Sequence, residues 1–255
     1  MTTARPAGDF DYEAAGGGYS VQRQADARIE AMVVAALGGS RTMVNVGAGA
    51  GSYEPRDRMV VAVEPSRQMR AQRGPGSAPV VEAVAEALPF ADRRFDAAMA
   101  TVTVHQWPDP ERGLRELRRV ATGPVVVLTF DGAALDRFWL AVYAPELITA
   151  ERGRYPAIER IRDVLGGTST VTEVPVPLDC TDGFTEAFYG RPERFLDPDV
   201  RAAQSAWGFV SPEATERAVH RLRTDLDTGD WDRRFGHLRT QPEFIGSLRL
   251  IVAEP

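Results

Sequence analysis

The stretch that decides the fold reads TMVNVGAGAGSYEP and spans Thr42 to Pro55. It begins as an apolar run and then places glycines at Gly47, Gly49 and Gly51. Glycine has no Cβ, so such a turn lets the backbone pass close to a ligand and adopt dihedral angles that other residues avoid. A glycine turn directly after a buried strand therefore predicts a ligand site at the carboxyl edge of a sheet.

Short apolar runs bounded by turn residues recur on both sides of this turn. They are apolar throughout rather than alternating, which is typical of strands buried on both faces. Helical patterns separate them, so the sequence predicts a Rossmann-like α/β fold with a parallel, doubly wound, seven-stranded sheet. The expected strands cover residues 42–46, 59–63, 79–84, 95–104, 124–130, 168–177 and 246–254.

The helical patterns have recognisable beginnings and ends. Residues 25–39 carry apolar side chains on one helix face and stop at two glycines. Residues 109–121 form a second helix, for which Asp109 is the expected N-cap and Pro110 the first helical residue. Residues 138–148 are expected to form an apolar helix between the fifth and sixth strands.

The domain organisation follows from a long gap between the last two strands. About 70 residues separate these strands, too many for a turn, and this segment is expected to be a mostly helical insertion. We expect an N-terminal helical cap segment (1–41), a Rossmann-like domain (42–177 with 246–255) and the insertion (178–245). The insertion serves either as a substrate lobe or lid, or as extra packing.

Composition narrows the class of protein. The chain has 255 residues, 44% hydrophobic and 26% charged, and a net charge of -6, which gives no overall basic surface for nucleic acid. It has a single cysteine, Cys180, no signal-peptide pattern and no apolar run long enough to span a membrane. We expect a cytoplasmic protein with no nucleic-acid or membrane partner and no metal site, whose oligomeric state has no signature in the sequence.

The acidic residue that ends the second strand refines the expected ligand. Glu64 can accept hydrogen bonds from both hydroxyls of a ribose. The dinucleotide pattern G-x-G-x-x-G fails, because Ser52 stands three residues after Gly49. Pro55 also disfavours a long phosphate-binding helix at the turn. A nucleoside without a phosphate chain is therefore favoured over the cofactor of a nicotinamide dehydrogenase.

Four motifs in order carry a family resemblance. They are VNVGAGAG, VAVEPS, AEALPFADRRFDAAMA and LRELRRVATGPVVVLTF, between about Thr42 and Phe130. In these motifs the sequence resembles the class I S-adenosylmethionine-dependent methyltransferases of the group called methyltransferase type 11. The resemblance implies S-adenosyl-L-methionine as cofactor. Asn45 departs from the pattern, because the family usually has an acid there.

The resemblance also implies roles for individual residues. The glycine turn would lie against the methionine and ribose of the cofactor, and Glu64 would bind the ribose hydroxyls. The two residues after Glu64 would flank the adenine, and the segment before LPF would contact the edge of the adenine ring. The end of the fourth strand would line the methyl-transfer site. The implied cofactor-binding residues are Gly47, Ala48, Gly49, Gly51, Glu64, Pro65, Ser66, Ala85, Glu86, Thr101 and Val102.

Two further sites have alternative interpretations. Tyr19 and Arg23 precede the first helix. Arg23 is expected either to pair with the cofactor's carboxylate or to be an ordinary surface residue. Tyr19 is expected either to shield the cofactor or to pack as an ordinary aromatic residue. His105 follows the fourth strand at the sheet edge and is expected either to be a general base or to order the turn. Trp107 either walls a substrate pocket or anchors the loop.

The resulting hypothesis is a methyltransferase that acts on a small-molecule acceptor at oxygen, nitrogen or carbon. Methyl transfer from a sulfonium depends mainly on alignment in a dry pocket, with a base only where the acceptor loses a proton. The alternative is a protein that binds S-adenosylmethionine without catalysis, as a sensor or partner module.

Overall fold

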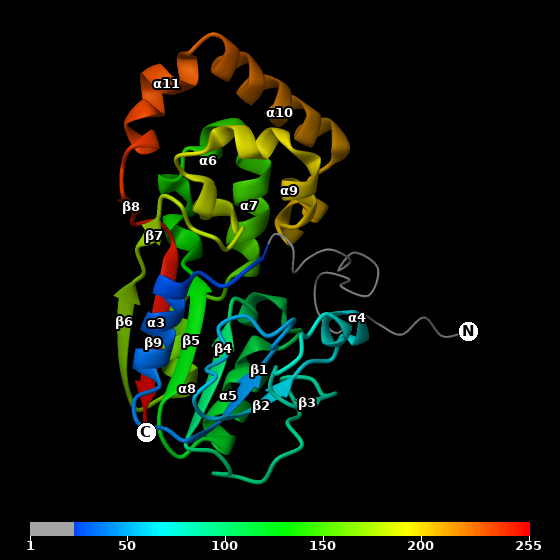
Figure 1. The fold of residues 1–255 in the computed structure, drawn as a ribbon, viewed down its shortest axis with the longest axis vertical. Coiled ribbons are helices and arrows are strands. Elements are labelled where there is room, and N and C mark those ends of the chain that lie inside the picture. Colours follow the sequence, from blue (N-terminus) through cyan, green and yellow to red (C-terminus); the bar gives the residue numbers. More distant parts are fainter. Residues whose placement is uncertain (1–22) are drawn as a thin grey trace, which may run out of the picture.

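A computed structural model describes residues 23–255 and shows a seven-stranded sheet with helices on both faces (Figure 1). The strand order is β3-β2-β1-β4-β5-β9-β6. These strands are Val80–Val81, Met59–Val63, Thr42–Val46, Ala97–Thr101, Val125–Phe130, Leu248–Glu254 and Thr168–Glu173. The Rossmann-like fold with a helical insertion before the last strand is confirmed.

Alternate residues of each central strand point to opposite faces of the sheet and build two cores. On one face, Met43 and Val126 pack in a cluster with Ile29 and Val33 of helix α3 (Ala27–Ala36). On the other face, Val44 and its neighbours pack against helices α5 (Pro110–Val120) and α8 (Ile158–Leu165). The apolar runs are continuous because both faces of the sheet are covered.

Local signals set the ends of the predicted helices. Asp26 caps α3 by accepting from the Arg28 amide at 3.0 Å. Asp109 caps α5 by accepting from the Arg112 amide at 3.0 Å, and Pro110 is the first helical residue as predicted. The predicted helix over 138–148 is divided into α6 (Leu140–Tyr143) and α7 (Pro145–Arg154), because proline interrupts the first helix and begins the second.

The prediction of a parallel sheet is wrong for the last strand. β9 runs antiparallel to both β5 and β6, whereas the pairs among β1 to β5 are parallel. The predicted strand over 168–177 is also broken. It divides into β6 and β7 (Val176–Pro177), and β7 pairs instead with β8 (Glu243–Phe244) in a small second sheet. Pro175 between them has no amide hydrogen to donate to a ladder.

The segment between β7 and β8 gathers at one end of the sheet, above β5 and β9 in Figure 1. Its helices pack with α6 and α7 into an aromatic cluster around Trp139 and Trp231. The helices of this segment are η3 (Thr185–Phe188), η4 (Pro192–Leu196), α9 (Pro198–Ala202), η5 (Ser205–Phe209), α10 (Pro212–Asp227), α11 (Asp230–Phe235) and η6 (Gly236–Arg239). Between residues 23 and 255, no helix has both the length and the apolar character needed to cross a bilayer.

Candidate active site

The glycine turn closes over the ends of β1 and β2. Gly47 and Gly49 have φ angles of 70° and 51°, in the left-handed region that glycine favours. The amides of Gly47 and Ala48 both donate to the Val63 carbonyl, at 2.9 and 3.0 Å. A Cβ on Gly47 would lie 2.1 Å from Oγ1 of Thr103. The turn therefore needs glycine at this position for its backbone angle and for its close approach to the segment after β4.

Glu64 lies under the turn and holds it. One carboxylate oxygen accepts from the Gly49 amide at 2.8 Å, and the other accepts from the Ser66 amide at 2.9 Å. Burial raises the pKa of Glu64, although the hydrogen bonds from Ser66 and Gly49 oppose the shift. Glu64, the residue predicted to bind the ribose, therefore lies directly after β2 beside the glycine turn, and its carboxylate also fixes the shape of that turn.

Asn45, which stands where the resembled family usually has an acid, contacts a buried ion pair. Asn45 donates through Nδ2 to Glu54 at 3.1 Å, and Glu54 forms a buried ion pair with Arg73 at 2.6 Å. Arg73 also donates to the Gly49 carbonyl at 3.2 Å. Gly51 faces this ion pair, since a Cβ there would lie 3.3 Å from Glu54. The pair supports the turn and does not line the cavity beside it.

The glycine-turn cavity lies against this turn. Several predicted cofactor residues come together here: Arg23, Gly47, Ala48, Gly49, Glu64, Thr101 and Val102 all line it. Other predicted residues do not line it and have local roles. Ser66 caps helix α4 (Arg67–Ala71), and Glu86 accepts from the Asp109 amide at 3.0 Å. The roles implied for Pro65, Ser66, Ala85 and Glu86 at the adenine stay predictions, and Tyr19 lies outside the described residues.

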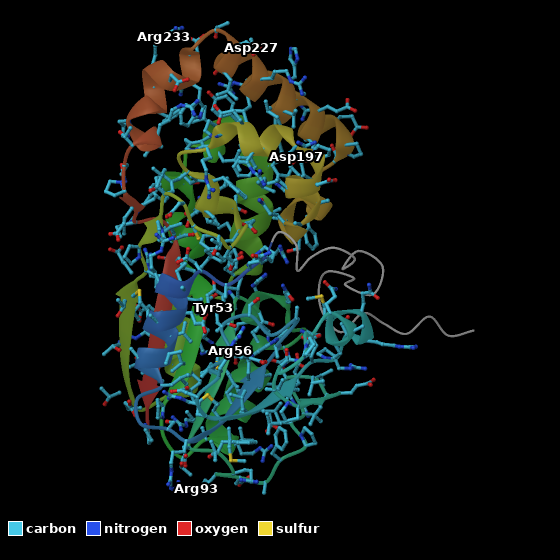
Figure 2. All side chains as sticks on the ribbon, viewed as in Figure 1. Tyr53, Arg56, Arg93, Asp197, Asp227 and Arg233 are labelled. Atoms are coloured by element: carbon cyan, nitrogen blue, oxygen red, sulfur yellow. The ribbon has the colours of Figure 1, made fainter. Side chains whose placement is uncertain are left out.

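Asp182 joins three parts of the chain at the wall of the glycine-turn cavity. Its carboxylate pairs with Nε of Arg23 at 2.5 Å and accepts from the Tyr53 hydroxyl at 2.6 Å. Tyr53 comes from the glycine-turn loop, and Figure 2 places it near the level where the helical part meets the sheet. Burial raises the pKa of Tyr53 well above its usual value, so the phenol remains a donor. This junction closes one side of the cavity.

We expect Tyr53→Phe to lower the free energy of unfolding by about 1–3 kcal/mol, because it removes a donor from a buried carboxylate. Tyr143→Phe is the matched control, since its hydroxyl donates to Asp225 at 2.8 Å in a partly exposed place. Urea unfolding of both variants makes the comparison. Equal effects would show that the Tyr53–Asp182 hydrogen bond contributes no more than the partly exposed Tyr143–Asp225 hydrogen bond.

Val102 is strained where β4 ends. Its φ is 53°, in the left-handed region that costs a β-branched residue energy. It lines the glycine-turn cavity and also a second cavity beyond it. The backbone reversal at Val102 ends β4 at Thr101, so the predicted strand over 95–104 stops early and continues as η1 (Val104–Gln106).

Replacing Val102 tests this strain. We expect Val102→Gly to leave the free energy of unfolding within about 1 kcal/mol of the original, since relief of strain offsets the lost side chain. The same change at Val61, a half-buried residue within β2, should cost more than about 2 kcal/mol. Thermal unfolding measures both, and a loss at Val102 as large as that at Val61 would contradict the strain.

The second cavity, called here the aromatic cavity, lies between the sheet edge and the helical insertion. It meets the glycine-turn cavity at the residues that line both, Arg23, Val102 and Gln106. Apolar and polar side chains line it together, as is typical of small-molecule sites. Its apolar wall consists of Val102, Phe130, Leu135, Phe138, Ile148, Tyr155 and Phe184.

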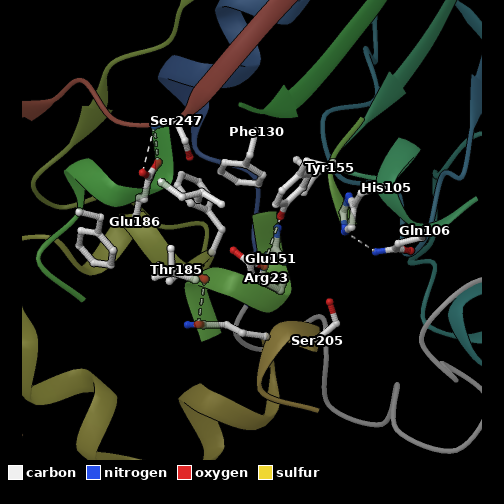
Figure 3. A pocket seen from close by; sticks show the side chains of 16 residues that line it. Arg23, His105, Gln106, Phe130, Glu151, Tyr155, Thr185, Glu186, Ser205 and Ser247 are labelled. Carbon is white, nitrogen blue, oxygen red and sulfur yellow. Dashed lines mark hydrogen bonds between the residues drawn. The ribbon is translucent and has the colours of Figure 1, made fainter. Parts of the chain in front are cut away.

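Buried acids face this apolar wall. Glu151 of α7 is 7% exposed, and burial raises its pKa to about 6. Glu186 of η3 is 1% exposed; burial raises its pKa to about 7, and both its oxygens accept from the Ser247 amide, at 3.0 and 2.9 Å. Figure 3 shows His105 and Gln106 at one end of the aromatic cavity and Glu186 with Ser247 at the other.

His105 lines the aromatic cavity, and its ring lies 4.7 Å from that of Tyr155. Burial, with help from Arg154 and Arg23, holds the pKa of His105 well below its usual value, so the imidazole is neutral near pH 7. No residue between 23 and 255 hydrogen-bonds its buried Nδ1. Trp107 packs instead in the core against α5, where a Cβ on Gly113 would lie 2.4 Å from its ring. Trp107 is therefore the loop anchor.

Comparisons with known proteins agree with this geometry. Residues 44–124 match a family model described as a methyltransferase domain. A crystal structure of a candidate methyltransferase from an antibiotic biosynthesis pathway of Anabaena variabilis superposes with a TM-score of 0.83 and 27% identity, covering 91% of this chain and 98% of that one.

Two other proteins share part of the sequence or the fold. A chloroplastic 2-methyl-6-phytyl-1,4-hydroquinone methyltransferase 1 of rice is 34% identical over 86 residues, which make up 33% of this chain. The match spans only 24% of that protein's length. Geranyl diphosphate C-methyltransferase from Streptomyces coelicolor, crystallised with S-adenosyl-L-homocysteine, shares the fold with a TM-score of 0.52 at 13% identity over 89% of this chain and 78% of that one. The chain therefore has the Rossmann-like fold of S-adenosylmethionine-dependent methyltransferases, and its residues 44–124 match a methyltransferase domain.

Proposed function

We propose that the protein moves the methyl group of S-adenosylmethionine to a small-molecule acceptor held in the aromatic cavity. The observation that carries this proposal is the junction of two cavities at Arg23, Val102 and Gln106. One cavity has the bare glycine backbone and the Glu64 carboxylate that a nucleoside needs, and the other has aromatic walls. A methyl group delivered from the first would meet an acceptor in the second.

The residues present fit the cofactor. Gly47 has no side chain, so the turn can lie close to Thr103 and leave its backbone open to a ligand. The Glu64 carboxylate lies directly after β2, where it can accept from ribose hydroxyls. Arg23 lines the glycine-turn cavity near Asp182, where we propose that it also meets the cofactor's carboxylate. When bound, S-adenosylmethionine supplies a methyl group on a sulfonium, and the chain's task is then to align an acceptor and exclude water.

A small aromatic acceptor suits the second cavity best. Phe130, Tyr155 and Phe184 provide flat apolar surfaces, and Phe130 packs against both other rings at 5.4 Å. The rice relative is named for a hydroquinone, which is also aromatic, although the match covers only 33% of this chain. We propose that residues 178–245 act as the substrate lobe, because Phe184, Thr185, Glu186 and Gln204 from this segment line the aromatic cavity.

Calorimetry with S-adenosylhomocysteine tests the cofactor assignment. We expect this product to bind the full chain at one site and to raise its melting temperature, as a ligand of the folded state does. NAD serves as the control and should do neither. Stabilisation by NAD, with no response to S-adenosylhomocysteine, would contradict the proposed function.

A further inference from the structure

Glu151 is the buried acid of the aromatic cavity that lies nearer to the glycine-turn cavity. Arg23, which lines both cavities, is close enough to lower the pKa of Glu151 and of His105. Figure 3 agrees with this order, because Glu151 lies with Arg23 and Tyr155 between the two ends of the cavity. An acceptor atom placed at the junction of the cavities would therefore meet Glu151 before Glu186.

The two acids also differ in how firmly the protein holds them. Both oxygens of Glu186 accept from the Ser247 amide at 3.0 Å or less, which fixes the orientation of this carboxylate at the far end of the cavity. Within residues 23–255, Glu151 accepts one long hydrogen bond, from the Tyr155 hydroxyl at 3.3 Å, and has an ion pair with Arg154 at 4.0 Å. Its carboxylate therefore retains lone pairs for a group inside the cavity.

We propose that Glu151 is the general base of this methyltransferase, and that the acceptor is an aromatic compound whose methyl-accepting atom carries a proton, as a hydroxyl or an amine does. This inference rests on the proposed function and adds to it a catalytic residue and a class of substrate. Tyr155 acts as a positioning residue, since its hydroxyl reaches Glu151 and its ring contacts both His105 and Phe130.

The step balances with the groups at hand. The acceptor's oxygen or nitrogen forms a bond to the methyl carbon while the carbon–sulfur bond breaks and its electron pair goes to sulfur. The proton of the acceptor atom passes to the carboxylate of Glu151. From there it can leave to solvent after the product departs, so no further reactant is needed.

The electrostatic surroundings suit a base that works near neutral pH. Burial raises the pKa of Glu151 to about 6, close to the range in which a base is both ionised and able to take a proton. His105 is a weaker base, because burial holds its pKa well below the usual value. The titratable and charged groups that act on Glu151 or line the same cavity are Arg23, His105, Arg154, Tyr155 and Glu186.

The test is Glu151→Gln in the full chain, with Glu146→Gln as the matched control on the same helix. Glu146 is half-exposed and pairs with Arg217 at the surface. The probes are 1-naphthol, catechol and 2-phenylethylamine, with 1,3-dimethoxybenzene as an aromatic compound without a protic atom. We expect wild-type kcat/KM for a protic probe to rise with pH through about 6. Glu151→Gln should lower kcat by about 10²–10⁴-fold, with little change in KM, and should remove that rise.

The outcomes separate the base from the function. Glu146→Gln should keep the wild-type rate and pH profile, and all three proteins should bind S-adenosylhomocysteine equally. A Glu151→Gln enzyme with the wild-type rate and pH profile would overturn the base assignment. A wild-type protein that binds S-adenosylhomocysteine but methylates no protic probe would overturn the substrate class. Failure of the wild type to bind S-adenosylhomocysteine would instead contradict the proposed function itself.

Discussion

Gly47→Ala is expected to destabilise the fold by about 3 kcal/mol or more and to lower the affinity for S-adenosylhomocysteine at least about 100-fold. The new Cβ would lie 2.1 Å from Oγ1 and 2.8 Å from Cβ of Thr103, so one of the two segments has to move. Such a shift would displace the turn from the cavity that it lines. Urea unfolding and calorimetry measure the two effects.

Gly38→Ala is the matched control for Gly47→Ala. Gly38 has a φ of 56°, similar to the 70° of Gly47, but an added Cβ meets nothing within 4 Å. Its cost should be about 1 kcal/mol from the backbone angle alone, with cofactor affinity unchanged. Adding Thr103→Gly to Gly47→Ala should recover stability. Equal costs at Gly38 and Gly47, or no recovery, would show that close approach is not the reason for glycine.

Glu64→Gln is expected to weaken the binding of S-adenosylhomocysteine by about 10²–10⁴-fold. The ribose would lose two charge-assisted hydrogen bonds, worth about 1.5–3 kcal/mol each. Glutamine also keeps only one acceptor oxygen, so either the Gly49 or the Ser66 amide would face an NH2 group, whereas the carboxylate accepts from both amides. Calorimetry on the folded variant measures the loss of affinity.

Glu82→Gln gives the control for Glu64→Gln. Glu82 follows β3 in the sequence, and its 72% exposed side chain pairs with Arg70 at 2.5 Å. Its substitution should leave cofactor affinity within a factor of about two, because exposed ion pairs contribute little. Wild-type affinity in Glu64→Gln would remove Glu64 from the cofactor site and leave its role as support for the turn.

The sequence predicted those parts of the fold whose signals are local. Asp26 and the glycines after residue 37 bound α3, and Asp109 with Pro110 begins α5, because caps act within one turn of the chain. Strand direction is not a local property. β9 is mostly buried, as the parallel strands are, and burial carries no signal for the direction in which a strand runs.

The site was predictable where backbone geometry determines it. The glycine turn and Glu64 lie together because the ends of β1 and β2 are neighbours in a parallel sheet. Asp182 and Tyr53 were not predicted to meet, because 129 positions separate them and only the folded insertion brings them into contact.

Glu151 and Glu186 were not predicted to belong to the site, because a charged residue in a sequence usually indicates a solvent-exposed position. A signal was nevertheless present at Glu151, which lies three and four residues after the buried Ile148 and Leu147, on the same face of α7. Glu186 stands between Phe184 and Phe188, all three of them buried. An acidic residue on an otherwise apolar helix face is therefore worth testing as part of a ligand-binding or catalytic site.

Transfer of an isotope-labelled methyl group tests the central claim most directly. Wild-type protein is incubated with S-adenosylmethionine labelled on the methyl group and with the small aromatic alcohols and amines named above, and products are identified by mass spectrometry. The account predicts label on the hydroxyl or amine atom of at least one acceptor, with one S-adenosylhomocysteine formed per product. If the protein binds S-adenosylhomocysteine tightly but all label stays on the cofactor, the account is contradicted, because the proposed class of acceptor is then wrong.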